Sequence, residues 1–165
     1  MTTGRGPAVS RPAPGAGAAP AAPPAPEHSL RMLSPDACFE LLEPGGVGRV
    51  GFASASGIMM LPVNFAVTRK TIVFRTAPDT LLAAYADAPV SFEVDHLDEV
   101  LREGWSVLVL GRAHTVTDER ELQRLEDQID LEPWAAGARD VYVRIAPNRI
   151  SGRSIGVTRQ SRPRP

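Results

Sequence analysis

The strongest constraint on the fold is an alternation of apolar and polar residues with a period of two. Residues 58–67 (IMMLPVNFAV) are apolar at every odd position, and residues 90–95 (VSFEVD) alternate strictly. Residues 104–116 (GWSVLVLGRAHTV) form a longer run of the same kind. Successive side chains of a β-strand point to opposite faces of a sheet, so the period predicts strands with one buried face. We therefore expect a mainly β fold.

Three shorter runs, at residues 48–52, 71–76 and 141–146, predict further strands. Pro62 cannot donate a backbone hydrogen bond to a neighbouring strand, so we expect it at an edge or a bulge. Gly111 is expected where a strand bends. Few long crossovers separate the six strands, which favours an antiparallel sheet, and closing that sheet removes its exposed edges. The prediction is a six-stranded antiparallel β-barrel with small helices.

Three short helices are predicted between the strands. Ser34 is a favourable N-cap and is followed by a proline at the first helical position. Asp79 is expected to cap a helix over residues 80–86, and Asp118 with Glu121 forms a capping box. The helix after Asp118 is amphipathic, with an apolar face formed by Leu122, Leu125 and Ile129.

Composition divides the chain into three parts. Residues 1–28 are almost entirely Ala, Pro and Gly and have little to bury, so we expect a disordered arm. Residues 29–155 carry the strand and helix patterns and predict one folded domain. Residues 156–165 are expected to form a flexible Arg/Pro tail. The arm is a candidate docking tail for a partner, but an unstructured extension is the simpler interpretation.

Charge and cysteine content exclude several classes of protein. The chain has 18 Lys+Arg against 19 Asp+Glu, so it lacks the basic patch of a nucleic-acid or membrane-surface protein. Cys38 is the only cysteine, which rules out an internal disulfide. No apolar run is long enough to span a bilayer, and no secretory signal is recognisable, so we expect a cytoplasmic protein. The three histidines lack metal-ligand spacing, and we assign no metal site.

Residues 73–81 (VFRTAPDTL) are the most informative candidate site. The predicted strand ends at Arg75 and Thr76, turns through Ala77, and leads into a helix that begins near Thr80 and Leu81. This arrangement offers a guanidinium group, hydroxyl groups and backbone N–H groups to one anion, such as a cofactor phosphate. The competing interpretation is that Arg75 pairs with a surface carboxylate and Thr76 only caps the helix.

Three other segments could contribute to a site. The irregular strand around Pro62, Val63 and Asn64 leaves backbone groups that could hydrogen-bond a planar heterocycle. Trp105, Ser106 and Val107 open the longest strand, although Trp105 fits an ordinary core as well. Trp134 and Arg139 lie close together in a turn-rich stretch, where they would form a simple loop in a monomer or anchors at a dimer interface.

Taken in order, these segments resemble an actinobacterial-type branch of the pyridoxamine 5′-phosphate oxidase-like superfamily, the FMN-binding split barrels. The resemblance covers about residues 30 to 155, and seven matching segments occur in register. They are GRVGF, LPVNFAV, VFRTAP, VSFEVD, GWSVLVLGRA, PWAAGARD and RISGRSI.

The resemblance implies a split-barrel homodimer with two cofactor sites at the subunit interface. Residues 62–64 would then lie along the flavin ring, and Arg75, Thr76 and the start of the next helix would hold the phosphate. Residues 105–107 would line the ring pocket, with Trp134 and Arg139 reaching in from the partner subunit. The implied activity is an oxidoreductase that uses FMN to act on a small organic substrate.

One departure from the family pattern concerns the phosphate. Many relatives have a lysine in a pattern like RTAPGSKL, whereas this chain reads RTAPDTLL, with Leu81 at that position and Asp79 before it. Losing a cation and gaining an anion weakens attraction for a phosphate. Three alternatives therefore stay open. One is the deazaflavin F420, held by a basic groove of Arg139, Arg144, Arg149 and Arg153. The others are a non-catalytic flavin- or haem-binding module and a dimeric scaffold without a cofactor.

Overall fold

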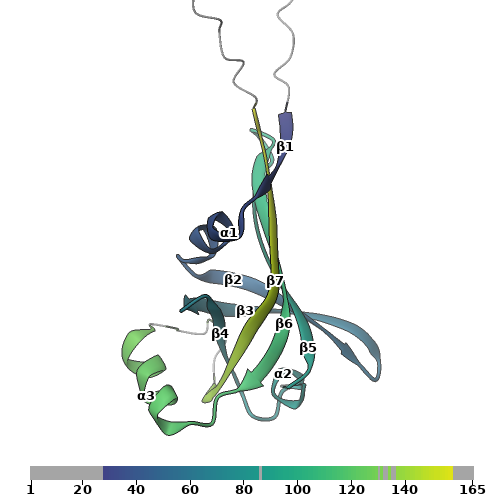
Figure 1. Ribbon diagram of the computed structural model, residues 1–165. Coiled ribbons are helices and arrows are strands. Elements are labelled where there is room, and N and C mark those ends of the chain that lie inside the picture. Colours follow the sequence, from purple (N-terminus) through teal and green to yellow (C-terminus); the bar gives the residue numbers. More distant parts are fainter. Residues whose placement is uncertain (1–27, 86, 130, 132–133, 135–136, 158–165) are drawn as a thin grey trace, which may run out of the picture.

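The computed structural model describes residues 28–157, except 86, 130, 132–133 and 135–136. Seven strands and three helices make up this part of the chain (Figure 1). The strands are β1 (His28–Leu33), β2 (Gly46–Ser54), β3 (Gly57–Thr68), β4 (Thr71–Thr76), β5 (Pro89–Asp98), β6 (Glu103–Thr115) and β7 (Val141–Val157). The helices are α1 (Pro35–Leu42), α2 (Leu81–Ala84) and α3 (Glu119–Gln128). The arm predicted over residues 1–28 lies outside the described residues except at His28, and so does most of the predicted tail.

All strand pairs are antiparallel, and six strands form a closed ring. The order in the sheet is β1-β7-β4-β3-β2-β5-β6, and a further pairing of β6 with β7 closes the ring. β7 makes this possible because its first part pairs with β4, while β6 pairs with it along most of its length. The predicted antiparallel barrel of mainly β structure is therefore confirmed.

The structure has one strand more than predicted, and β7 is longer than predicted. β1 lies outside the ring and pairs along the last six residues of β7, so that this end of the sheet projects beyond the barrel (Figure 1). β7 reaches Val157 rather than ending near residue 146. Both differences have the same cause. The projecting strands keep much of their surface exposed, so they lack the regular apolar alternation that marks a buried face.

The core lies inside the ring, where the alternating apolar residues point. Phe65, Phe74, Phe92, Val107, Val109 and Ile145 are among the side chains that are at most 2% exposed. The rings of Phe65 and Phe92 meet edge to face with their centroids 5.0 Å apart. A Cβ atom at Gly48 would lie 2.3 Å from the Phe92 ring, so only glycine fits beside it. A smaller cluster, of Val73, Val116, Leu125 and Tyr142, lies under α3 on the outside of the barrel.

The helix caps agree with the predictions in two of three cases. Ser34 Oγ accepts a hydrogen bond from the Ala37 N–H at 3.2 Å, and Asp118 Oδ1 accepts one from the Glu121 N–H at 2.8 Å. α2 differs, because its N-cap is Thr80 rather than Asp79 and the helix ends at Ala84. The Thr80 hydroxyl is already fixed by the carbonyl of Ala77, which places it ready to accept from the first turn.

Gly111 lies where expected, at a break in the register between β6 and β7. A Cβ atom there would come within 2.4 Å of the Ala146 carbonyl oxygen. The close approach of the two backbones requires glycine at this bend. Among the described residues, no helix is long and apolar enough to cross a membrane.

Candidate functional site

β3 and β4 separate at one end of the barrel, and the separation creates the candidate site. The two strands pair from Thr68 and Thr71 to Phe65 and Phe74, and no further. Beyond that point β3 pairs only with β2 among the described strands, and β4 continues along β7. Pro62 therefore lies on a free edge, as predicted. We call this opening the β3–β4 notch and define it by residues 62–64 on β3 and 75–76 on β4.

Two predicted site residues flank the notch on the outside of the barrel. If the pairing of β3 with β4 continued by one more residue, Asn64 would lie opposite Arg75. Residues opposite each other in antiparallel strands share a face, so both side chains start from the outer face. Val63, between Pro62 and Asn64, points into the core and is 7% exposed. The notch thus offers Asn64, Arg75 and the free backbone edge of β3 to a ligand, whereas Val63 contributes only its backbone.

Arg75 is engaged by the segment that leads into β7. Its Nε donates to the Arg139 carbonyl oxygen at 2.7 Å, and its Nη2 lies 3.6 Å from Asp140 Oδ1. The guanidinium carbon lies 5.2 Å from the centroid of the Tyr142 ring. Pairing with a surface carboxylate was the competing sequence interpretation, and the structure contains that contact. The side chain is nevertheless 28% exposed, while that of Asp140 is 79% exposed, so the pair is open to water.

The turn after β4 is held together by its own hydroxyl groups. Thr76 is 1% exposed, and its Oγ1 lies 2.7 Å from Oγ1 of Thr80. Thr80 in turn donates to the Ala77 carbonyl and accepts from the Ala83 N–H at 3.3 Å. These threonines therefore fix the turn beside Arg75. Leu81 is 48% exposed and points an apolar side chain to solvent at the position where the family pattern has lysine.

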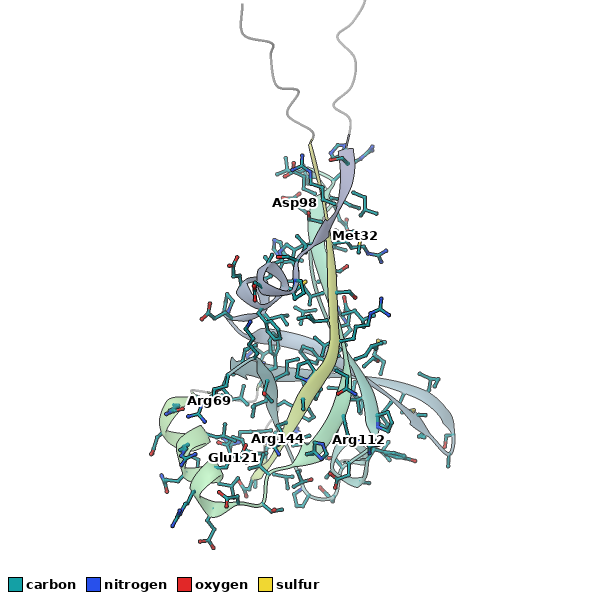
Figure 2. The ribbon with its side chains drawn as sticks, in the orientation of Figure 1. Met32, Arg69, Asp98, Arg112, Glu121 and Arg144 are labelled. Atoms are coloured by element: carbon teal, nitrogen blue, oxygen red, sulfur yellow. The ribbon has the colours of Figure 1, made fainter. Side chains whose placement is uncertain are left out.

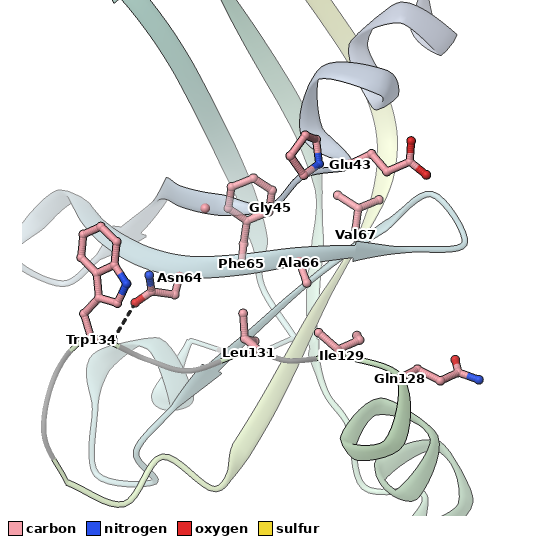
Figure 3. Close-up of a pocket in the computed structure, with 12 residues that line it drawn as sticks. Glu43, Gly45, Asn64, Phe65, Ala66, Val67, Gln128, Ile129, Leu131 and Trp134 are labelled. Carbon is pink, nitrogen blue, oxygen red and sulfur yellow. Dashed lines mark hydrogen bonds between the residues drawn. The ribbon is translucent and has the colours of Figure 1, made fainter.

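Trp134 meets Asn64 on the outer face of β3. The backbone N–H of Trp134 donates to Asn64 Oδ1 at 3.0 Å, and Trp134 is 83% exposed (Figure 3). Trp134 thus contacts Asn64, and Arg139 contacts Arg75. The resemblance implied that Trp134 and Arg139 reach in from a partner subunit, but here they contact residues of their own chain.

A groove of about 420 Å³ lies beside this contact and was not predicted from the sequence. β3 forms its floor, between the turn that follows α1 on one side and the described residues at the end of α3 and after it on the other (Figure 3). Its lining residues are Glu43, Pro44, Gly45, Gly46, Asn64, Phe65, Ala66, Val67, Gln128, Ile129, Leu131 and Trp134. Of the lining residues, the sequence analysis placed Ile129 on a helix face and Asn64 and Trp134 in candidate site segments. The groove depends on how two distant turns approach each other, which no local pattern records.

Trp105, Ser106 and Val107 lie far from the notch within one chain. Trp105 pairs with Ser154 of β7, and Arg75 pairs with Tyr142 of the same strand. Twelve residues separate Tyr142 from Ser154, which is about 40 Å along an extended strand. Trp105 stacks on His96 with ring centroids 6.3 Å apart. Ser106 accepts a hydrogen bond from Arg153, and Val107 is fully buried. One chain therefore does not bring residues 105–107 to the notch.

The arginines proposed for a deazaflavin groove do not gather in one place. Arg144 and Arg153 lie nine residues apart on β7, about 30 Å along the strand. Arg144 pairs with Glu121 of α3 at 3.3 Å (Figure 2), and Arg153 donates to Ser106. A single basic groove for a long anionic tail is therefore not formed by this set in one chain.

A second charged cluster lies on the outer face of the barrel beside the notch, because Arg49 pairs with Pro62 of β3. Arg49 of β2 donates to both Glu93 and Asp95 of β5. The hydrogen bond to Asp95 is the largest cause that raises the pKa of the Arg49 guanidinium, and the hydrogen bond to Glu93 is the next. The guanidinium and the two carboxylates form ion pairs with one another at the surface. Among the described residues, no group of three or more His, Cys, Asp or Glu side chains is arranged to hold a metal ion.

Matches to known proteins extend over most of the folded part of the chain. The family model described as pyridoxamine 5′-phosphate oxidase matches residues 34–154. An uncharacterized protein of Mycobacterium tuberculosis is 33% identical over 126 residues, which are 73% of this chain and 82% of that protein. The structure is similar to an FAD binding protein from Mycobacterium smegmatis, with a TM-score of 0.60, 31% identity and coverage of 76% of this chain and 98% of that one. It is also similar to an FAD-binding protein from Mesorhizobium loti, with a TM-score of 0.63, 26% identity and coverage of 79% and 99%.

Proposed function

The chain belongs to the pyridoxamine 5′-phosphate oxidase family, and from that premise we propose that it is a flavin-dependent oxidoreductase with its cofactor at the β3–β4 notch. FMN is the first candidate, because an arginine beside the notch suits a terminal phosphate. The two structural relatives named above are FAD-binding proteins, which supports a flavin in general. The substrate would be a small organic molecule. The observation that carries the proposal is the free edge of β3 beside Arg75.

The residues at the notch fit a flavin phosphate and ring. The 3.6 Å separation of Arg75 from the exposed Asp140 is longer than a hydrogen bond, so a phosphate dianion could displace that carboxylate at little cost. Thr76 and Thr80 keep the adjacent turn in place. At residues 62–64 the edge of β3 that faces away from β2 pairs with no other described strand, and its backbone groups could hydrogen-bond the polar edge of the ring. A bound flavin supplies hydride or electron transfer, and the protein orients and tunes it.

We further propose that the protein functions as a homodimer. The outer face of the projecting sheet and the adjoining barrel wall carries seven exposed apolar side chains, namely Leu30, Met32, Met60, Leu97, Leu108, Leu110 and Ile155. An apolar set of this size on one sheet face is typical of a protein interface. The β7 residue that pairs with Trp105 lies about 40 Å along the strand from the β7 residue that pairs with Arg75. Trp105 and Arg75 can therefore contact one flavin only if they come from different subunits.

Introducing the missing cation should strengthen phosphate binding. We expect Leu81→Lys to raise the affinity for FMN severalfold, since a partly exposed charge contributes up to about 1 kcal/mol. Leu81 is half-exposed and outside the core, so the lysine should not disturb the fold. Fluorescence titration with FMN measures the change, with Leu81→Gln as the uncharged control. An affinity for FMN that is the same in both variants would contradict a phosphate near residue 81.

The absorbance spectrum of the freshly purified protein tests the proposed function. The expected result is the pair of visible flavin bands, and mass spectrometry of the small molecule released on denaturation should identify it. A Soret band would indicate haem instead. A colourless protein that takes up F420 would identify the deazaflavin variant. A colourless protein that binds no added flavin, deazaflavin or haem would overturn the proposal and favour a dimeric scaffold without a cofactor.

A further inference from the structure

The groove beside Asn64 has one charged side chain among its described lining residues. That side chain is Glu43, at the end of α1. No hydrogen bond or ion pair links its carboxylate to another described residue. Two amides, of Asn64 and Gln128, supply the other polar side chains. Among its described lining residues, the groove therefore carries one negative charge and no positive charge.

The two ends of the groove differ in chemistry. Figure 3 shows Glu43 and Gln128 at the end beside Val67, and Trp134 with Asn64 at the opposite end. The floor between them runs from Asn64 to Val67, which is about 10 Å of extended strand. The apolar side chains of Val67, Ile129 and Leu131 lie along this length. An exposed indole at one end offers a flat face on which an aromatic ring can stack.

We propose that this groove binds the substrate, and that the substrate is a cationic molecule with a flat apolar part. The cation lies at Glu43, and the flat part lies on Trp134 beside Asn64, next to the notch. The spacing of the two ends sets their separation at about 10 Å. Molecules that carry a phosphate or carboxylate in place of the cation are repelled by Glu43 and bind more weakly. This inference deepens the proposed function, since it places a substrate class beside the proposed flavin.

Matched ligands of opposite charge test the inference. The probes are 4-phenylbutylamine and 4-phenylbutyrate, which share a ring and a four-carbon chain but differ in charge. Titration of the purified protein is followed by tryptophan fluorescence, and Trp134→Phe identifies the signal from the groove. We expect the amine to bind at least about threefold more tightly than the carboxylate, which is the difference expected from one exposed charge pair. Added salt should reduce this difference.

Glu43→Gln should abolish the preference for the amine. Its side chain is exposed at the end of α1, so the substitution leaves the core unchanged. Glu40→Gln is the matched control, because Glu40 is an exposed glutamate on the same helix that does not line the groove. Equal binding of both probes, or a preference that survives Glu43→Gln, would overturn the inference.

Flavin content, measured on the same samples, separates this inference from the proposed function. Charge-selective binding in a protein that takes up no flavin would overturn the proposed function and support the groove. Bound flavin without charge selectivity would support the proposed function and overturn the groove.

Discussion

Replacing Arg75 with methionine lowers the affinity for FMN by about tenfold to 150-fold, the equivalent of roughly 1.5–3 kcal/mol for hydrogen bonds to a charged group. Methionine keeps an apolar stem over the Tyr142 ring but removes the charge and the donors. The measurement is a fluorescence titration with FMN. Arg124→Met is the control, because Arg124 is an exposed arginine on α3.

A second titration separates contact with the phosphate from an indirect effect. Arg75 also holds the carbonyl of Arg139, so its loss could disturb the segment that leads into β7. Riboflavin has the same ring as FMN but no phosphate. If Arg75 binds the phosphate, Arg75→Met weakens FMN binding and leaves riboflavin binding nearly unchanged. An equal loss for both ligands would show that Arg75 acts only by positioning residues 139–142.

Placing a carboxylate at Leu110 should separate the dimer and release the flavin. Leu110 lies on the outer face of β6, opposite Arg149 of β7 and Ser91 of β5, and is 41% exposed in one chain. A two-fold dimer would bury the introduced carboxylate twice. Removing each carboxylate from water costs several kcal/mol, and pairing with the exposed Arg149 offsets only part of that cost. We expect Leu110→Glu to be a folded monomer with little bound flavin.

Light scattering at micromolar concentration measures the mass, and a thermal melt checks that the variant is folded. Gln123→Glu, which adds the same charge to the exposed face of α3, should remain a dimer. A wild-type protein that is monomeric at this concentration would contradict the proposed dimer. So would a Leu110→Glu variant that stays dimeric.

Most of the barrel could be predicted because buried faces leave a regular pattern. The alternation in β3 and β5 follows from one face packing on the core, and Gly111 occurs where two backbones approach. β1 and the end of β7 could not be predicted in this way. They pair with each other outside the ring, where exposed side chains are free to vary.

The residues of the candidate site stay a prediction, and their contacts could not be predicted from local patterns. The register of β3 with β4 brings Asn64 and Arg75 to one notch. The contacts of Arg75 with Arg139 and Asp140 depend on a segment that begins 64 residues further along the chain. Such pairing at long sequence separation leaves no local signal. The groove beside Asn64 was missed for the same reason.

A crystal structure of the protein grown with FMN would locate the cofactor relative to Arg75. We expect a dimer in which the phosphate lies within hydrogen-bond distance of the Arg75 guanidinium. We also expect the ring to lie along residues 62–64 and beside Trp105 of the partner subunit. FMN bound elsewhere, with Arg75 still paired to Asp140 and the notch filled by protein side chains, would contradict both expectations.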